Sequence, residues 1–154
     1  MKEIKLENLC ASIEEKKRKI LELFDGCTTS EKLYQKLIEL GKNQSKLADN
    51  QKNSRTKVSG CQSQIYLVAT LEKGKVFFKA ESDALISAGL AFLLTSVYSD
   101  DVPEALFKCP PDHIEKLNLS DALTPGRSSG LRSIFLKMQQ EALLLLSSKK
   151  PQDN

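Results

Sequence analysis

The stretch that decides the fold is CQSQIYLVATLEKGKVFFKA, at residues 61–80. Side chains alternate through its first half, so every second residue from Ile65 to Leu71 falls on one apolar face. The run Lys73–Lys75, with glycine at its centre, predicts a tight turn, and residues 76–80 predict a strand that returns beside the first. An antiparallel hairpin is therefore the expected centre of the fold.

Helical patterns lie on both sides of this hairpin. Apolar residues recur at helical spacing within residues 6–23, and a capping box at Thr28 and Glu31 predicts a second helix that stops at Gly41. Between them and the hairpin, the polar segment 42–56 predicts a long, flexible connection.

Further helices are predicted after the hairpin. Ser82 and Asp83 are expected to cap a helix that runs to Tyr98, and close packing on a neighbour would explain its interior glycine, Gly89. The last helix is expected to follow the serines at 128 and 129. Its buried stripe would consist of Leu131, Ile134, Phe135, Met138 and Ala142.

Together these elements predict an α+β fold, with a small antiparallel sheet of about three strands and helices packed mainly on one face. The third strand is expected within residues 46–58 or near Phe107. A chain of 154 residues suits one core and is too short for two ordinary domains. We expect an N-terminal helical extension at 1–23, a domain at 24–146 and a C-terminal tail at 147–154.

Composition narrows the classes of function. Charged residues make up 28% of the chain and hydrophobic ones 40%, as in soluble globular proteins. A net charge of +3 is too small to indicate nucleic-acid binding. The apolar run at residues 142–146 is far shorter than the roughly 20 residues of a membrane span. Residues 1–5 carry charge and begin no apolar signal segment, so a cytoplasmic location is expected.

The chain has four cysteines, which a non-secreted protein of this size is expected to keep reduced. They form no Cys-x-x-Cys pair, and two prolines separate Cys109 from the single histidine, His113. These spacings give no metal site. His113 also lacks the Gly-x-Ser-x-Gly context of a serine hydrolase, and the sequence contains no phosphate-binding loop.

Cys61 and Arg127 are the candidate reactive residues. Cys61 follows Gly60 at a loop-to-strand hinge, where no side chain on Gly60 would hinder a partner's approach to the sulfur. If the strand includes Cys61, its thiol points toward the core with Ile65. A half-buried structural cysteine is the alternative. Arg127 precedes the last helix and could reach an anion or a thiolate, or it is simply a solvated surface charge.

Three motifs occur in order along the chain. They are VSGCQSQIYL at 58–67, AESDALI at 80–86 continuing through Gly89-Leu90, and LTPGRSSGL at 123–131. Together they resemble the SufE family of cysteine desulfuration proteins over roughly residues 24–142. The chain departs from the family's usual residues at a few positions. These are Ser59 for proline, Tyr66 for tryptophan, Gly126 for serine and Ser129 for asparagine.

The resemblance implies that Cys61 accepts persulfide sulfur from a cysteine desulfurase, stimulates that enzyme, and passes the sulfur to an iron–sulfur scaffold complex. It implies a role for Arg127 beside the thiolate and a partner-binding surface formed by Gly60, Gln62, Ser63, Gln64 and Asp83. Pyridoxal phosphate belongs to the desulfurase, so no cofactor is expected in this chain, which would be a monomer or a homodimer.

An ordinary thiol, with a pKa of about 8.5, is only a few per cent ionised at neutral pH. Lys57, Arg55 and Arg127 are the candidate activating charges. We expect Cys61 to be shielded at rest and to swing outward when the desulfurase docks.

Three alternatives stay open from the sequence. The chain could serve a different desulfurase and other sulfur pathways. It could be a thiol redox protein in which Cys10, Cys27 or Cys109 resolves oxidised Cys61. It could also be a binding adaptor in which Cys61 has no chemical role.

Overall fold

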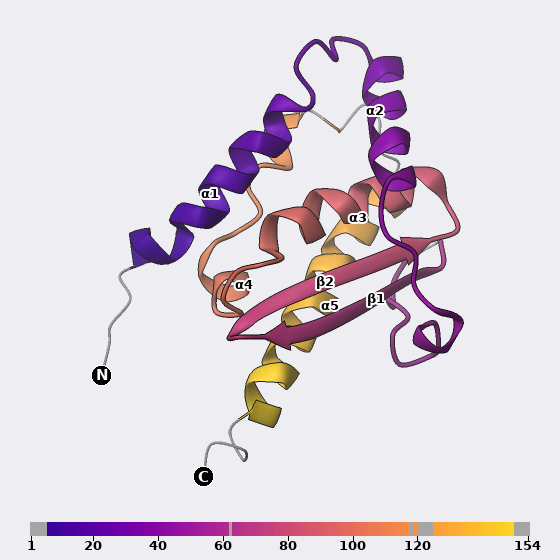
Figure 1. Ribbon diagram of the computed structural model, residues 1–154. Coiled ribbons are helices and arrows are strands. Elements are labelled where there is room, and N and C mark those ends of the chain that lie inside the picture. Colours follow the sequence, from indigo (N-terminus) through magenta and orange to yellow (C-terminus); the bar gives the residue numbers. More distant parts are fainter. Residues whose placement is uncertain (1–5, 62, 118, 120–124, 150–154) are drawn as a thin grey trace.

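The computed structural model describes residues 6–61, 63–117, 119 and 125–149. A two-stranded hairpin has helices mainly on one of its faces, with α3 along β2 and α5 crossing behind β1 (Figure 1). In chain order the elements are α1 (Leu6–Glu22), α2 (Ser30–Lys42), η1 (Asp49–Gln51), β1 (Ile65–Glu72), β2 (Lys75–Ser82), α3 (Leu85–Tyr98), α4 (Ala105–Lys108), η2 (Glu115–Leu117) and α5 (Pro125–Lys149). The predicted α+β class is confirmed.

The hairpin follows the pattern that predicted it. β1 and β2 pair antiparallel from Ile65 opposite Ser82 to Glu72 opposite Lys75. Lys73 and Gly74 both have positive φ, at 52° and 81°, as a tight hairpin turn requires. Ile65 and Leu67 are buried, whereas the later positions of that face are only partly covered. The alternation therefore identifies the core face at the end of β1 nearest Cys61.

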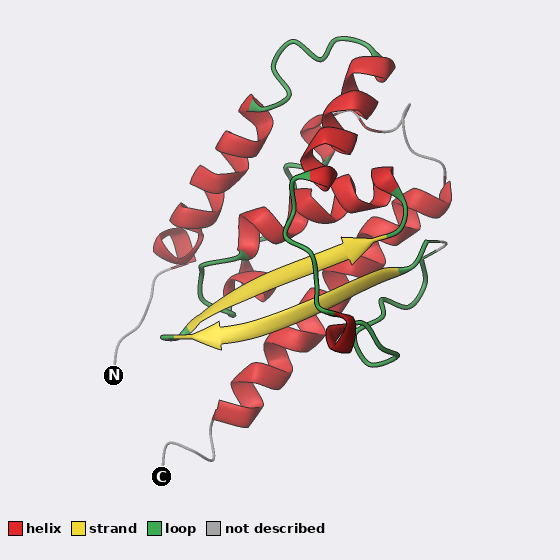
Figure 2. Ribbon diagram, turned by 45° about the vertical axis from the view of Figure 1, so that its right-hand side comes forward, coloured by secondary structure: helices red, strands yellow, loops and turns green. Residues whose placement is uncertain are grey.

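Among the described residues the sheet has two strands, so the expected third strand is absent (Figure 2). Lys57 forms an isolated bridge to Tyr66, and Val76 forms one to Asp101. The segment at 56–58 does lie beside β1, but the turn at Ser59 and Gly60 ends the pairing before a strand can form. The other predicted location, near Phe107, is helical and belongs to α4.

The connection between α2 and the hairpin is a long loop, as predicted, and hydrogen bonds hold it at several points along its length. Glu81 of β2 accepts a hydrogen bond from the Leu47 amide at 2.8 Å and one from Lys52 Nζ at 3.1 Å. The Thr56 hydroxyl donates to the Gln51 carbonyl at 2.7 Å. Thr56 bonds within the connection itself, whereas the two bonds to Glu81 join positions 34 and 29 residues apart in the sequence.

Two glycines allow α2 and α3 to approach closely. A Cβ on Gly89 would lie 2.2 Å from the carbonyl oxygen of Leu37, and one on Gly41 would lie 2.7 Å from the Gly89 amide. The close packing expected around Gly89 is confirmed. The helix starts differ from prediction: Thr29 caps α2, and Ala84 rather than Ser82 or Asp83 occupies the N-cap of α3.

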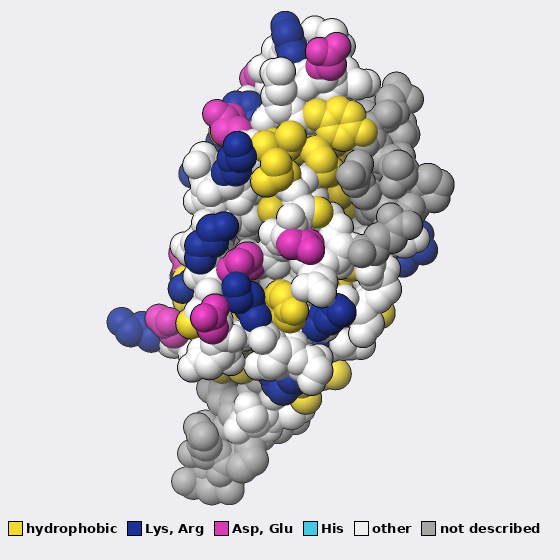
Figure 3. All heavy atoms as spheres, turned by 90° about the vertical axis from the view of Figure 1, so that its right-hand side faces the viewer, with side chains coloured by type: hydrophobic (Ala, Val, Ile, Leu, Met, Phe, Trp, Pro, Cys, Tyr) yellow, Lys and Arg dark blue, Asp and Glu magenta, His cyan; other side chains and the backbone are white. Residues whose placement is uncertain are grey.

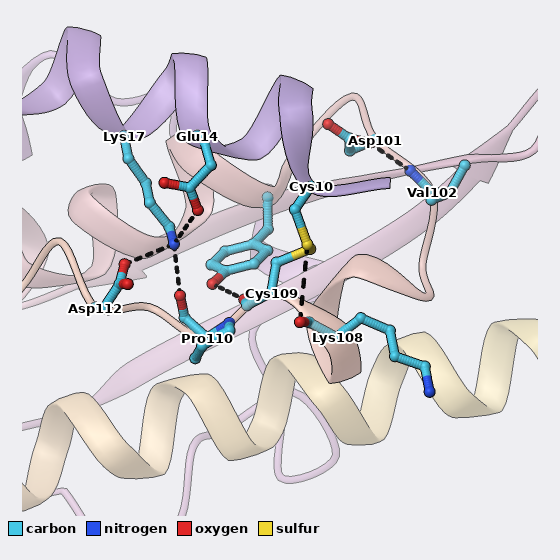
Figure 4. The surroundings of a disulfide bond; sticks show 10 residues. Cys10, Glu14, Lys17, Asp101, Val102, Lys108, Cys109, Pro110 and Asp112 are labelled. Carbon is cyan, nitrogen blue, oxygen red and sulfur yellow. Dashed lines mark hydrogen bonds and ion pairs between the residues drawn. A yellow bond between two sulfur atoms is a disulfide. The ribbon is translucent and has the colours of Figure 1, made fainter. Parts of the chain in front are cut away.

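α1 is joined to the loop after α4 by a disulfide and a buried lysine. Cys10 and Cys109 are bonded, with an S–S distance of 2.06 Å, so the expectation that all cysteines are reduced is wrong (Figure 4). Lys17 is 3% exposed, and its Nζ lies 2.7 Å from Asp112 Oδ1 and 2.6 Å from the Pro110 carbonyl. A partner 99 residues away leaves no local signal in the sequence.

The surface carries both signs of charge. On the face in Figure 3, basic and acidic side chains are interleaved over the described residues, and hydrophobic side chains gather in its upper part. None of the helices, as far as they are described, is long and apolar enough to cross a membrane.

Candidate functional site

Cys61 lies in a loop closed at its base by backbone hydrogen bonds. This Cys61 loop comprises residues 59–64, of which Gln62 lies outside the described residues. The Val58 amide donates to the Ile65 carbonyl at 2.8 Å, which brings the two ends together. β1 begins only at Ile65, so Cys61 is not part of the strand. The orientation expected for a Cys61 within the strand alternation therefore does not apply.

The Cys61 loop lies against the first turns of α5. The Cys61 thiol points to the Gly130 carbonyl oxygen, with 3.8 Å between sulfur and oxygen. Gly60 has a φ of +86°, and a Cβ there would lie only 2.6 Å from Ser133 Oγ. Glycine at position 60 therefore serves both the turn and the close approach to the helix.

The other end of the loop is fixed to α3 and the residues before it. Ser63 Oγ and Ser87 Oγ are 3.0 Å apart. The Gln64 amide donates to Asp83 Oδ1 at 3.2 Å, and the Asp83 amide donates back to the Gln64 carbonyl at 3.3 Å. The structure thus brings three of the predicted partner-binding residues together around the exit of the loop.

The Cys61 thiol is free and half-buried. Its burial raises its pKa, because a low-dielectric environment disfavours the thiolate. Of the candidate activating charges, Arg55 pairs with Glu141 on α5, its Nη2 lying 3.7 Å from Glu141 Oε1, and Lys57 is exposed. The folded protein therefore favours the protonated thiol.

Arg127 lies in the first turn of α5 and not in the loop before it, because the helix begins at Pro125. Its side chain is outside the part that the structure describes. The expected contact between Arg127 and the thiolate stays a prediction.

The other cysteines and the histidine have structural surroundings. Cys27 is free and partly exposed, while the bond between Cys10 and Cys109 removes both as resolving partners for Cys61 in this state. His113 is 1% exposed, its Nε2 lies 2.9 Å from the Leu93 carbonyl, and burial lowers its pKa. The described residues contain no group of three or more potential metal-ligating side chains of His, Cys, Asp or Glu.

Sequence reasoning missed the residues on which the loop rests. Ser87, Gly130 and Ser133 contact the Cys61 loop from α3 and α5. Gly130 lies within the motif at 123–131, and Ser133 shares its side of the last helix, but neither signal indicated a contact with the loop.

The fold and site define a small α+β protein with a free thiol on a glycine-hinged loop. The family model SufE, an Fe-S metabolism associated domain, matches residues 18–142. The chain therefore belongs to the SufE family. Membership places it in iron–sulfur metabolism and implies sulfur transfer alongside a cysteine desulfurase.

Individual relatives agree with this assignment. An uncharacterised SufE-like protein of Synechocystis sp. is 38% identical over 125 residues, covering 81% of this chain and 79% of the relative. SufE-like protein 1, chloroplastic/mitochondrial, of Arabidopsis thaliana is 36% identical over 132 residues. The match covers 84% of this chain but only 35% of that longer protein. A solution structure of a hypothetical protein from Thermus thermophilus matches with a TM-score of 0.68 and 25% identity, over 86% of this chain and 96% of that one.

Proposed function

We propose that Cys61 accepts sulfur from a cysteine desulfurase as a persulfide and passes it on to an iron–sulfur scaffold complex. The observation that carries the proposal is a free, half-buried thiol on a glycine-hinged loop, in a chain of this family. Cys61 would stimulate the desulfurase by removing the sulfur that otherwise blocks its active cysteine.

The chemistry needs a single displacement. The Cys61 thiolate attacks the terminal sulfur of the desulfurase persulfide, and a new S–S bond forms as the old one breaks. The desulfurase cysteine leaves as a thiolate, Cys61 carries the sulfane sulfur, and no external electrons are consumed. On the partner, pyridoxal phosphate would activate free cysteine, whose sulfur forms the first persulfide on the desulfurase's own cysteine. This chain would need no cofactor for the step that follows.

Docking has to supply what the free protein lacks. Since burial raises the pKa of Cys61, a partner must expose the thiol or bring positive charge or amide dipoles to it. Arg127 is the candidate within this chain. Gly60, Gln62, Ser63, Gln64 and Asp83 would form the surface around the emerging loop.

The test is to incubate the protein with candidate desulfurases and cysteine and to locate the persulfide by mass spectrometry. We expect the added sulfur on Cys61. The Cys61→Ser protein should accept no sulfur, and the Cys27→Ser protein should accept it as wild type does. Sulfur accepted by the Cys61→Ser protein would refute the proposal. Full function without acceptance would instead favour an adaptor, and peroxide-driven disulfide formation at Cys61 would favour a redox role.

A further inference from the structure

One side of α5 follows the Cys61 loop and the segment that leads into it. This α5 stripe consists of Gly130, Ser133, Lys137 and Glu141, whose spacings of three and four residues place them on the same side of the helix. The first two residues lie against the Cys61 loop, and the last two lie against Arg55, ahead of the loop. The helix therefore contacts both the thiol and its approach.

Lys137 holds the backbone of Arg55. Its Nζ donates to the Arg55 carbonyl oxygen at 2.7 Å and lies 3.5 Å from Glu141 Oε2. The Lys137 side chain is only 16% exposed, and that of Glu141 is 10% exposed. Glu141 Oε1 lies 3.7 Å from Arg55 Nη2, so α5 binds both the main chain and the side chain of Arg55.

The segment after Arg55 connects the residue held by Lys137 to the Cys61 loop. Thr56 is buried, and its carbonyl accepts the Leu67 amide at 2.8 Å. The Val58 amide donates to Ile65 at the same distance, and the turn at Gly60 follows. The entry to the Cys61 loop is thus held between β1 on one side and Lys137 on the other.

We propose that Lys137 is a positioning residue for Cys61. By holding Arg55 on α5, it keeps the loop against Gly130 and the thiol half-buried until a partner opens the loop. The inference rests on the proposed role of Cys61 as the sulfur acceptor and adds a residue to it. Lys137 acts through Arg55, so its effect is on how often the thiol is exposed.

The experiment compares alkylation rates of Cys61 and Cys27 in the same molecule, measured by mass spectrometry without any partner. Lys137→Met removes the donor and keeps the apolar stem, Lys137→Arg restores a donor, and Lys19→Met changes an exposed lysine on α1 as a matched control. We expect the Cys61-to-Cys27 ratio to rise roughly threefold to tenfold in Lys137→Met, as for loss of one hydrogen bond that closes a loop. Lys19→Met should leave the Cys61-to-Cys27 ratio unchanged. Lys137→Arg should return the ratio most of the way to the wild-type value.

An unchanged ratio in Lys137→Met, or an equal rise at both cysteines, would overturn the proposal, because the second result reports general loosening. If Lys137→Met does not fold, Glu141→Gln provides the same comparison with the carboxylate charge removed and its shape kept, and a higher ratio is again expected. The readout needs no desulfurase. Absence of persulfide on wild-type Cys61 would therefore refute the proposed function, and an unchanged alkylation ratio would refute the positioning role.

Discussion

The sulfur of Cys61 lies 3.8 Å from the carbonyl oxygen of Gly130, a residue 69 positions later in the chain. The partial burial of the thiol therefore comes from packing against a helix and not from its place in a strand. The thiol is half-buried, and its full exposure would require the loop to separate from α5. Gly60 lies against Ser133, Ser63 bonds Ser87 and Gln64 bonds Asp83, so these contacts fix the loop in the observed position.

The first prediction concerns the pH dependence of Cys61. Because burial raises its pKa, alkylation of the free protein should increase with pH with a midpoint above the value of about 8.5 for an unperturbed thiol. Iodoacetamide rates at Cys61 across the pH range measure this, with the same cysteine in the denatured protein as reference. A midpoint at or below that of the denatured protein would contradict it.

The same shift fixes the sign of its effect on stability. The folded state retains the proton to higher pH than the unfolded chain does. The stabilisation that protonated Cys61 gives the folded state is therefore fully present below the unfolded-state pKa. It is lost as the pH rises through the folded-state pKa. The Cys61→Ser protein should lose less stability than wild type over that alkaline interval.

A second prediction is that Gly60→Ala both destabilises the protein and displaces the loop. A left-handed φ costs a residue with a Cβ about 1–2 kcal/mol, and the new methyl would also meet Ser133 Oγ. Denaturant unfolding should show that loss, and alkylation of Cys61 should accelerate.

A double variant separates the two causes. Adding Ser133→Gly to Gly60→Ala removes the steric contact and leaves the backbone strain. We expect it to restore slow alkylation but only part of the stability. If both properties recovered together, the backbone conformation of Gly60 would have no energetic role.

The sequence predicted what depends on local pattern. The hairpin follows from alternation and a glycine turn, and the packing role of Gly89 follows from its cost inside a helix. The Cys61–Gly130 contact and the Cys10–Cys109 bond join positions far apart in the chain. The local sequence around these residues does not predict which partner each one contacts. The local composition of residues 42–56 predicts a loop but not that Glu81 of β2 holds this loop in place.

A third prediction concerns the disulfide. A crosslink over 99 residues restricts the unfolded chain strongly, so reducing the Cys10–Cys109 bond should lower the free energy of unfolding by about 4 kcal/mol. Unfolding with and without reductant measures the change. Cys10→Ser should match the reduced protein under both conditions, and Cys27→Ser should retain the response to reductant. Rapid alkylation of Cys10 and Cys109 in unreduced protein would show that the bond is not formed.

The last prediction separates two roles for Asp83, which the resemblance to the SufE family predicts to bind the partner. Its carboxylate accepts the Gln64 amide at 3.2 Å, so Asp83→Ala should loosen the exit of the Cys61 loop. Asp83→Asn keeps an acceptor oxygen and removes the charge. In the free protein, Ala should raise the alkylation rate of Cys61 relative to Cys27 roughly twofold to fivefold, as for loss of an exposed hydrogen bond, and Asn should stay near wild type. Equal acceleration by both would show that this hydrogen bond does not hold the loop. Binding of the Asn variant to the desulfurase then tests the charge alone, because its loop remains closed while any electrostatic contribution to docking is gone.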